Sequence, residues 1–347
     1  MSPKIFILYT GGTAGMKASS DGYRPCAGYL QEQLARSPKF NDPRVPRFDI
    51  EELSPLLDSA NMTPSHWGQI AKAVESRYDD YDGFIVIHGT DTMAYTASAL
   101  SFMLENTAKP VVLTGAQVPL AEVRNDAESN LLLSLMFLGG HHRRMSEVFV
   151  CFDNLLLRGN RTTKVDADAF AALDSPNFPH VGRAGTSIEI EPSLLRPPPP
   201  GGAPFNVIPI GNTAVAAVRL FPGIRAEYLI NMLLPPVEGV VLECFGAGTM
   251  PSDNKPLLRA LEAASLHGQV VVAVTQCVRG TADLGLYETG SALESVGVVS
   301  GFDMTAEAAL TKLLYLFAKG YTQEETRVLM GKNLRGELTP PNADTAS

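Results

Sequence analysis

Short apolar runs alternate with amphipathic stretches through the first half of the chain. The runs rich in β-branched and aromatic residues lie at 5–9, 83–89, 110–115 and 147–152. Apolar residues recur at helical spacing within 63–78, 92–105 and 130–138. This alternation is typical of βαβ units. The pattern therefore predicts an α/β fold whose larger N-terminal domain contains a mostly parallel sheet.

A proline-rich segment separates this region from a second, smaller one. Residues 196–202 read RPPPPGG, and proline lacks the amide donor that strand and helix interiors need. Beyond it, strand-like runs again alternate with helical stretches. We predict an N-terminal domain over 1–195, a Pro/Gly-rich linker over 196–212 and a C-terminal α/β domain over 213–347. The domain ends in a tail of low apolar content, 339–347, that we expect to be disordered.

Composition and charge narrow the classes of partner. The 347 residues include 28 Lys plus Arg and 37 Asp plus Glu, and no basic stripe is present to neutralise phosphates. Nucleic acid is therefore not an expected partner. No apolar run approaches the roughly 18 residues of a membrane span, and the N-terminal run IFILY is shorter than a secretory core. We expect a soluble cytoplasmic protein that does not bind membranes.

The four cysteines predict neither metal chemistry nor disulfides. They are widely spaced, and none forms a C-x-x-C pair or lies near a histidine at ligand spacing. We interpret them as reduced structural thiols. The sequence therefore predicts no metal site.

A glycine-rich turn follows the first predicted strand. Gly11 and Gly12 permit a sharp turn, and the hydroxyl of Thr13 comes directly after them. By itself this is typical of a structural turn. A nucleotide loop is disfavoured, since neither G-x-G-x-x-G nor a Walker lysine is present.

Polar residues also follow the strand at 83–89. Thr90 and Asp91 stand at the start of a predicted helix, where one of them could cap it and leave the other free. His88, at the strand end, we interpret as a half-buried histidine with satisfied hydrogen bonds.

Three further polar residues complete the candidate set. Lys164 follows two threonines in a strand-like segment that could direct its ammonium toward the crevice, although a lone lysine is usually a surface residue. Asp58 and Ser59 could bind the polar ends of an amino acid or form only a turn.

A hydroxyl nucleophile needs a proton acceptor. Thr90, Asp91 and Lys164 offer candidates, but burial and an ion pair with Asp91 would act on Lys164 in opposite directions. The identity of the base is left open.

Taken together and in order, the motifs resemble those of the bacterial-type L-asparaginase family, in its cytoplasmic type I branch. The resemblance covers nearly the whole chain. Its motifs are KIFILYTGGTAGM, GYRPCAGYL, LLDSANMTPSHW, FIVIHGTDTMAYTASALSFML, VVLTGAQVPL, RGNRTTK, SGFDMTAEAALTKL and LRGE.

The resemblance implies a two-domain asparaginase-like fold and hydrolysis of L-asparagine to L-aspartate and ammonia without a cofactor. It further implies a homodimer or homotetramer in which a neighbouring subunit completes the site. The implied roles are a nucleophile, Thr13; a tyrosine on a mobile loop above it, Tyr23; a second catalytic set, Thr90, Asp91 and Lys164; ligands of the substrate's amino and carboxylate groups, Asp58 and Ser59; a backbone carbonyl facing the scissile amide, Ala116; and the neighbour's contribution, Tyr287.

One residue departs from the family pattern, and three alternatives stay open. Ala14 stands where an isoleucine usually follows the nucleophile, which could loosen the packing behind Thr13. Water rather than Thr13 could attack the amide directly. The chain could also be a sensory protein without turnover, although binding alone needs no nucleophile. Finally, it could prefer glutamine, which differs from asparagine by one methylene.

Overall fold

The computed structural model describes residues 2–20 and 22–340. The seven residues 341–347, which make up most of the predicted disordered tail, lie outside this range. The chain divides into two compact units, with the division between Pro209 and Ile210. Each unit has its own sheet and its own apolar core.

The N-terminal unit is built on an eight-stranded sheet in the order β13-β12-β9-β8-β7-β5-β1-β4. The strands are β1 (Lys4–Gly11), β4 (Arg47–Leu57), β5 (Gly83–Ile87), β7 (Val111–Thr114), β8 (Val148–Phe152), β9 (Leu155–Arg158), β12 (Gly182–Ala184) and β13 (Ile188–Ile190). The five strands from β4 to β8 in this order pair in parallel, and the remaining pairs are antiparallel. The predicted mostly parallel sheet is confirmed.

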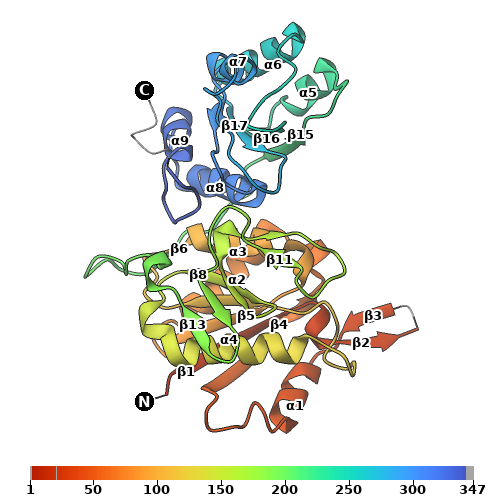
Figure 1. The fold of residues 1–347 in the computed structure, drawn as a ribbon, viewed down its shortest axis with the longest axis vertical. Coiled ribbons are helices and arrows are strands. Elements are labelled where there is room, and N and C mark those ends of the chain that lie inside the picture. The colour runs from red at the N-terminus through yellow and green to blue at the C-terminus, as the bar shows by residue number, and fades with distance from the viewer. Residues whose placement is uncertain (1, 21, 341–347) are drawn as a thin grey trace. The chain divides into compact units, whose positions relative to one another are not determined.

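Helices cover both faces of this sheet (Figure 1). Helices α1 (Tyr29–Arg36) and α4 (Ala127–His141) pack on one face, where their leucines meet the side chains of Ile5, Ile7 and Tyr9. Helices α2 (Pro64–Ser76) and α3 (Met93–Met103) contact β1, β7 and β8. Successive side chains of a strand point to opposite faces of the sheet. Alternate residues of β1 therefore point toward the helices on one face, and the residues between them point toward the helices on the other.

Helix α2 shows how local sequence sets these elements. Thr63 is its N-cap and forms a reciprocal capping box with His66, and Pro64 occupies the first turn, where no amide donor is needed. The apolar residues at helical spacing, Trp67, Ile70, Ala71 and Val74, are the ones that the helix buries. The helix predicted over 63–78 is confirmed.

Strand β4 was not predicted by the pattern. It lies at the edge of the sheet and alternates between partly buried and exposed residues, with acidic side chains at Asp49, Glu51 and Glu52. An edge strand covered on one face only lacks the continuous apolar run of a central parallel strand. Its pairing with β1 nevertheless brings the loop at Asp58 beside the glycine turn.

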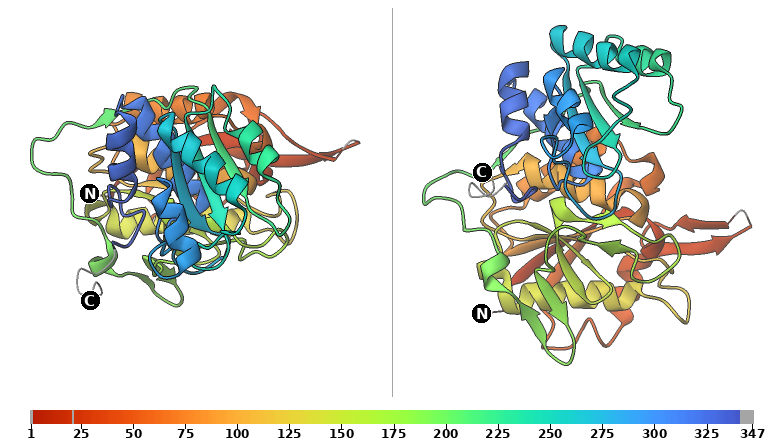
Figure 2. Two further views of the ribbon diagram at one scale, coloured as in Figure 1. Left: turned by 90° about the horizontal axis from the view of Figure 1, so that it is seen from above. Right: turned by 45° about the horizontal axis from the view of Figure 1, so that its top comes forward.

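Small two-stranded ribbons complete this unit. They are β2 (Met16–Ser19) with β3 (Gly22–Pro25), β10 (Thr163–Lys164) with β11 (Leu173–Asp174), and β6 (Leu104–Glu105) with β14 (Asn206–Val207). The β2–β3 hairpin projects away from the large sheet in both views of Figure 2. One-turn 3₁₀ segments, η1 (Thr13–Gly15), η2 (Ser59–Asn61) and η3 (Thr90–Thr92), come shortly after the ends of β1, β4 and β5.

The C-terminal unit is a smaller α/β layer structure, as predicted. Its parallel sheet has the order β15 (Val215–Arg219), β16 (Gly239–Cys244), β17 (Val270–Thr275) and β18 (Val299–Ser300). Leucines of α5 (Ala226–Met232), α6 (Lys255–Leu266) and α7 (Glu288–Ser295) form one core with this sheet. Helices α8 (Ala306–Ala318) and α9 (Gln323–Met330) also contact it.

The LRGE motif has a structural role in this unit. The Lys312 ammonium lies 2.6 Å from Glu337, and both side chains are fully buried. Glu337 also accepts hydrogen bonds from the backbone amides of Leu334 and Arg335. A buried charge is tolerated only when it is paired and hydrogen-bonded. The pair therefore holds the segment after α9 onto α8.

Candidate active site

The ends of strands β1, β4 and β5 lie so close together that no side chain fits between them. Gly12 has φ +84°, and a Cβ built on it would lie 2.4 Å from the amide nitrogen of Gly89. Gly11 has φ +121°, and its Cβ would lie 2.0 Å from the Leu57 carbonyl oxygen, which accepts a hydrogen bond from the Gly12 amide at 3.1 Å. Glycine tolerates both the conformation and the close approach. The ends of β1, β4 and β5 therefore form one packed edge.

Thr13 sits at this edge, at the start of η1 and directly after Gly12. Its side chain is partly exposed, and its hydroxyl has no hydrogen-bond partner among the described residues. The fully buried Tyr9 supports the turn from below, since its hydroxyl donates to the Gly12 carbonyl at 3.2 Å. Burial raises the pKa of Tyr9, which therefore stays a neutral donor. Thr13 is thus a free hydroxyl on a braced turn.

Lys164 joins the two polar residues after β5. Its Nζ donates to Thr90 Oγ1 at 2.9 Å and to Asp91 Oδ1 at 2.6 Å. The Thr90 residue is 6% exposed, whereas the Asp91 side chain is 63% exposed. The expectation that Thr90 or Asp91 caps the following helix is wrong: no side chain caps η3 or α3. Both residues bind Lys164 instead.

The sequence prediction missed Gln117, which contacts the same threonine. Thr90 Oγ1 donates to Gln117 Oε1 at 2.9 Å, and Gln117 Nε2 donates to the carbonyls of Ala167 and Ala169 at 3.0 and 3.3 Å. The sequence did contain one sign of this role, since Gln117 comes just after a predicted strand and next to Ala116, which was already a candidate site residue. A polar side chain there faces the crevice of an α/β sheet.

Asp126 fixes the backbone of this loop. Its carboxylate accepts from the amides of Gln117 and Val118 at 2.9 to 3.1 Å, and from the Asn130 amide group at 3.2 Å. Asn130 also donates to the Gly115 carbonyl. Both side chains are buried. The loop after β7 is therefore rigidly supported by the start of α4.

Asp58 and Ser59 lie at the same edge, after β4. Asp58 accepts from the Ala60 amide at 3.0 Å, as in the turn that the sequence allowed. Ser59 is buried, its carbonyl accepts from Thr92, and its hydroxyl would be 2.4 Å from a Cβ at Gly89. Their predicted contact with substrate stays a prediction.

Tyr23 is on the β2–β3 hairpin, half exposed, and its hydroxyl donates to Glu122 Oε1 at 2.6 Å. This bond raises the pKa of Tyr23. Ala116 is fully buried after β7, whereas Tyr287 is more than half exposed at the N-cap of α7 in the C-terminal unit. The functional roles predicted for these three residues are not tested by these positions.

His88 is fully buried, so the expected half-buried position is wrong. Its Nδ1 lies 2.7 Å from the Gly89 carbonyl, and its Nε2 lies 2.9 Å from Thr96 Oγ1, which accepts from Trp67 at 3.0 Å. A carbonyl only accepts, so Nδ1 carries the proton and Nε2 accepts from Thr96. Burial lowers the pKa of His88 to about 4. The predicted satisfied hydrogen bonds are confirmed. His88 is neutral at pH 7 because of its lowered pKa, and it supports the loop that carries Thr90.

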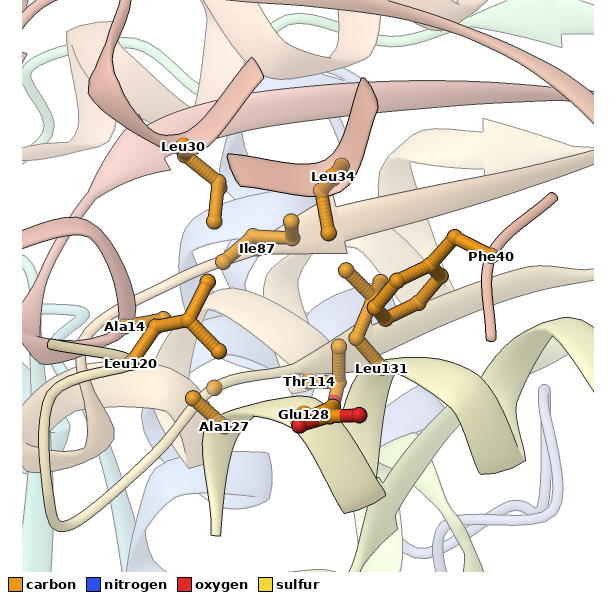
Figure 3. A pocket seen from close by; sticks show the side chains of 11 residues that line it. Ala14, Leu30, Leu34, Phe40, Ile87, Thr114, Leu120, Ala127, Glu128 and Leu131 are labelled. Carbon is orange, nitrogen blue, oxygen red and sulfur yellow. The ribbon is translucent and has the colours of Figure 1, made fainter. Parts of the chain in front are cut away.

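A small apolar cavity lies behind Thr13. Figure 3 shows the Ala14 side chain at this cavity, beside Leu120 and across from Leu30, Leu34 and Leu131. Its volume is about 10 Å³, close to the smallest space that holds one water-sized sphere. The short side chain at Ala14 borders this small unfilled space.

No cluster of His, Cys, Asp or Glu in residues 2–20 and 22–340 could hold a metal ion. The cysteines are free thiols. Burial raises the pKa of Cys151 and of Cys244 to about 12, which leaves them unreactive. Within the same residues, no helix is both long and apolar enough to span a membrane.

Comparisons with known proteins cover both units. Residues 4–196 match the family model "Asparaginase, N-terminal", and residues 214–330 match "Glutaminase/Asparaginase C-terminal domain". L-asparaginase 1 of Escherichia coli (strain K12) is 49% identical over 337 residues, which are 97% of this chain and 98% of that protein.

Solved structures agree with these matches. The crystal structure of L-asparaginase I from Vibrio cholerae aligns with a TM-score of 0.90 and 45% identity, covering 98% of this chain and 100% of that one. The thermostable L-asparaginase from Thermococcus kodakarensis aligns with a TM-score of 0.86 and 32% identity, covering 97% and 100%.

The cavity is too small for a full isoleucine side chain. We expect Ala14→Ile to lower the free energy of unfolding by about 1 kcal/mol or more, because it adds three carbon atoms where the space holds about one water-sized sphere. Urea denaturation measures this, with Ala18→Ile on the exposed face of β2 as a control that changes stability by less than about 0.5 kcal/mol. A gain in stability in Ala14→Ile would contradict this account of the cavity.

The buried His88 should make stability depend on pH. Its folded pKa of about 4 lies below the ordinary 6.5, so the unfolded chain binds the extra proton between these values. The contribution is complete above pH 6.5 and is lost as the pH falls toward 4, by about 3 kcal/mol. As the pH falls, the difference in the free energy of unfolding between wild type and His88→Gln should decrease by that amount. The exposed control His267→Gln should show the same pH dependence as wild type. A constant advantage over His88→Gln contradicts the assignment.

Proposed function

The chain belongs to the asparaginase family, and on that premise we propose how its site hydrolyses L-asparagine to L-aspartate and ammonia. The observation that carries the proposal is the Lys164 ammonium bound to both Thr90 and Asp91, on the loop whose Gly89 touches Gly12. This places a hydrogen-bonded acid–base set on the neighbour of the loop that presents the free Thr13 hydroxyl.

Thr13 is the nucleophile in this proposal. Its hydroxyl gives up a proton as its oxygen forms a bond to the side-chain amide carbon of asparagine. The carbon–nitrogen bond then breaks, and the nitrogen takes a proton and leaves as ammonia. Water adds to the resulting ester, the threonine oxygen recovers a proton, and aspartate is released. The absence of side chains at Gly11 and Gly12 lets the backbones of Leu57 and Gly89 approach the turn that carries Thr13.

The second set holds and moves protons. Asp91 keeps the Lys164 side chain in place, and Thr90 accepts a hydrogen bond from the Lys164 ammonium. The hydroxyl of Thr90 orients the attacking oxygen through a hydrogen bond. Little free energy is needed to reorganise these residues during the reaction, since their hydrogen bonds already exist without substrate.

Substrate contacts come from the neighbouring loops. Asp58 supplies a carboxylate for the α-amino group, and Ser59 supplies a hydroxyl for the α-carboxylate. The carbonyl oxygen of Ala116 accepts hydrogen bonds from the N–H groups of the scissile amide. Tyr23 covers Thr13 when the β2–β3 hairpin closes, which requires its hydroxyl to leave Glu122.

We propose further that the protein is a cytoplasmic homodimer or homotetramer in which a neighbour supplies Tyr287. Support comes from the type I resemblance, from the free thiols and from the exposed position of Tyr287. Light scattering of the purified protein tests the assembly. We expect the mass of two or four chains, and a monomer that is fully active would contradict the shared site.

The nucleophile is tested by substitution. Thr13→Ala should lower ammonia release from L-asparagine by at least about 1,000-fold, because no group nearby replaces the attacking oxygen. Thr13→Ser, which keeps a hydroxyl, should retain much more activity than Thr13→Ala. A coupled ammonia assay with asparagine and with glutamine, each over a range of concentrations, measures both variants and the substrate preference. Turnover of Thr13→Ala at the wild-type rate would remove Thr13 from the mechanism.

A further inference from the structure

Gln117 has a hydrogen-bond arrangement that allows only one orientation of its side-chain amide. Its Nε2 faces two carbonyl oxygens, those of Ala167 and Ala169, and carbonyls can only accept. The amide oxygen must therefore be the atom that faces Thr90. The loop that presents these carbonyls is itself fixed, because Asp166 Oδ1 accepts from the amides of Asp168 and Ala169.

This orientation determines the direction of the Thr90 hydroxyl. A threonine hydroxyl has one hydrogen and two lone pairs. The hydrogen is donated to Gln117 Oε1 at 2.9 Å, and one lone pair accepts from Lys164 Nζ at 2.9 Å. What Thr90 has left is a lone pair, so it can only accept a hydrogen bond from a further group.

We propose that Gln117 is a positioning residue that fixes Thr90 as a hydrogen-bond acceptor toward the reacting atoms. The inference rests on the proposed function, in which a hydroxyl or a water must lose a proton in each half of the reaction. With Gln117 in place, Thr90 accepts a hydrogen bond from that hydroxyl or water. Without it, the Thr90 hydroxyl rotates and its own hydrogen competes for the attacking oxygen.

The main test is a double-mutant cycle on ammonia release. Gln117→Met removes both hydrogen-bonding atoms at similar volume and should lower kcat roughly 10- to 100-fold, with a change in KM below about threefold. In a Thr90→Val background the same substitution should lower kcat by less than about threefold, because the hydroxyl that it orients is already absent. An equal loss in both backgrounds, or unchanged kcat in Gln117→Met, overturns the proposal.

Gln117→Glu separates the two sides of the amide and guards against a misfolded methionine variant. Glutamate keeps an acceptor for Thr90 but cannot donate to Ala167 and Ala169. It should therefore be less impaired than Gln117→Met. Its carboxylate also stands beside the Lys164 ammonium, so the pH profile of kcat/KM should move to higher pH. Equal impairment of the two variants, or an unshifted profile, overturns the proposal.

Two controls make the result specific. Gln31→Glu adds the same charge on the exposed side of α1 and should leave the pH profile unchanged. Wild type and Thr13→Ala are assayed alongside. If wild type releases ammonia and Thr13→Ala does not, a negative result at Gln117 overturns this inference alone. If wild type releases none, the proposed function has failed first.

Discussion

The site depends on the close approach of two backbones, at Gly12 and Gly89. A Cβ at Gly12 would lie 2.4 Å from the Gly89 nitrogen, which is too close for any side-chain atom. Because β1 and β5 are neighbouring parallel strands, this approach joins the turn of Thr13 to the loop of Thr90. Ser59 packs against Gly89 as well, which adds the loop after β4. The rest of the site is built around this contact.

Buried and half-buried hydrogen bonds hold each loop from behind. Tyr9 supports the turn at Gly12. His88 donates to the Gly89 carbonyl and is held in turn by Thr96, which accepts a hydrogen bond from Trp67. Asp126 fixes the loop that carries Gln117. The reacting groups proposed here are thus placed by neutral or hydrogen-bonded residues that do not themselves react. Ala14 is the exception, since its side chain leaves a space behind Thr13.

Much of this could be predicted from the sequence, and the failures have physical reasons. The central strands were found because they are buried on both faces, and α2 because its cap and its apolar spacing agree. Strand β4 was missed because an edge strand carries acidic residues. His88 was placed half-buried because a strand end gives no sign that a helix covers it.

Tertiary contacts were harder to predict than elements. Lys164 and Thr90 are 74 residues apart, and the sequence offered them only as candidates for one crevice, which the resemblance then grouped as a catalytic set. Gln117 was missed for a different reason. A lone glutamine carries no charge and has no motif of its own, so its role becomes visible only when the partners of both amide atoms are known.

The central claim is that Thr13 forms an ester with the substrate, and partitioning between nucleophiles tests it most directly. L-asparagine and the β-methyl ester of L-aspartate would be turned over in the same hydroxylamine buffer. If both pass through one ester on Thr13, the ratio of β-aspartyl hydroxamate to aspartate is the same for the two substrates. A ratio that changes with the leaving group would mean that water attacks the substrate directly, and would contradict the account.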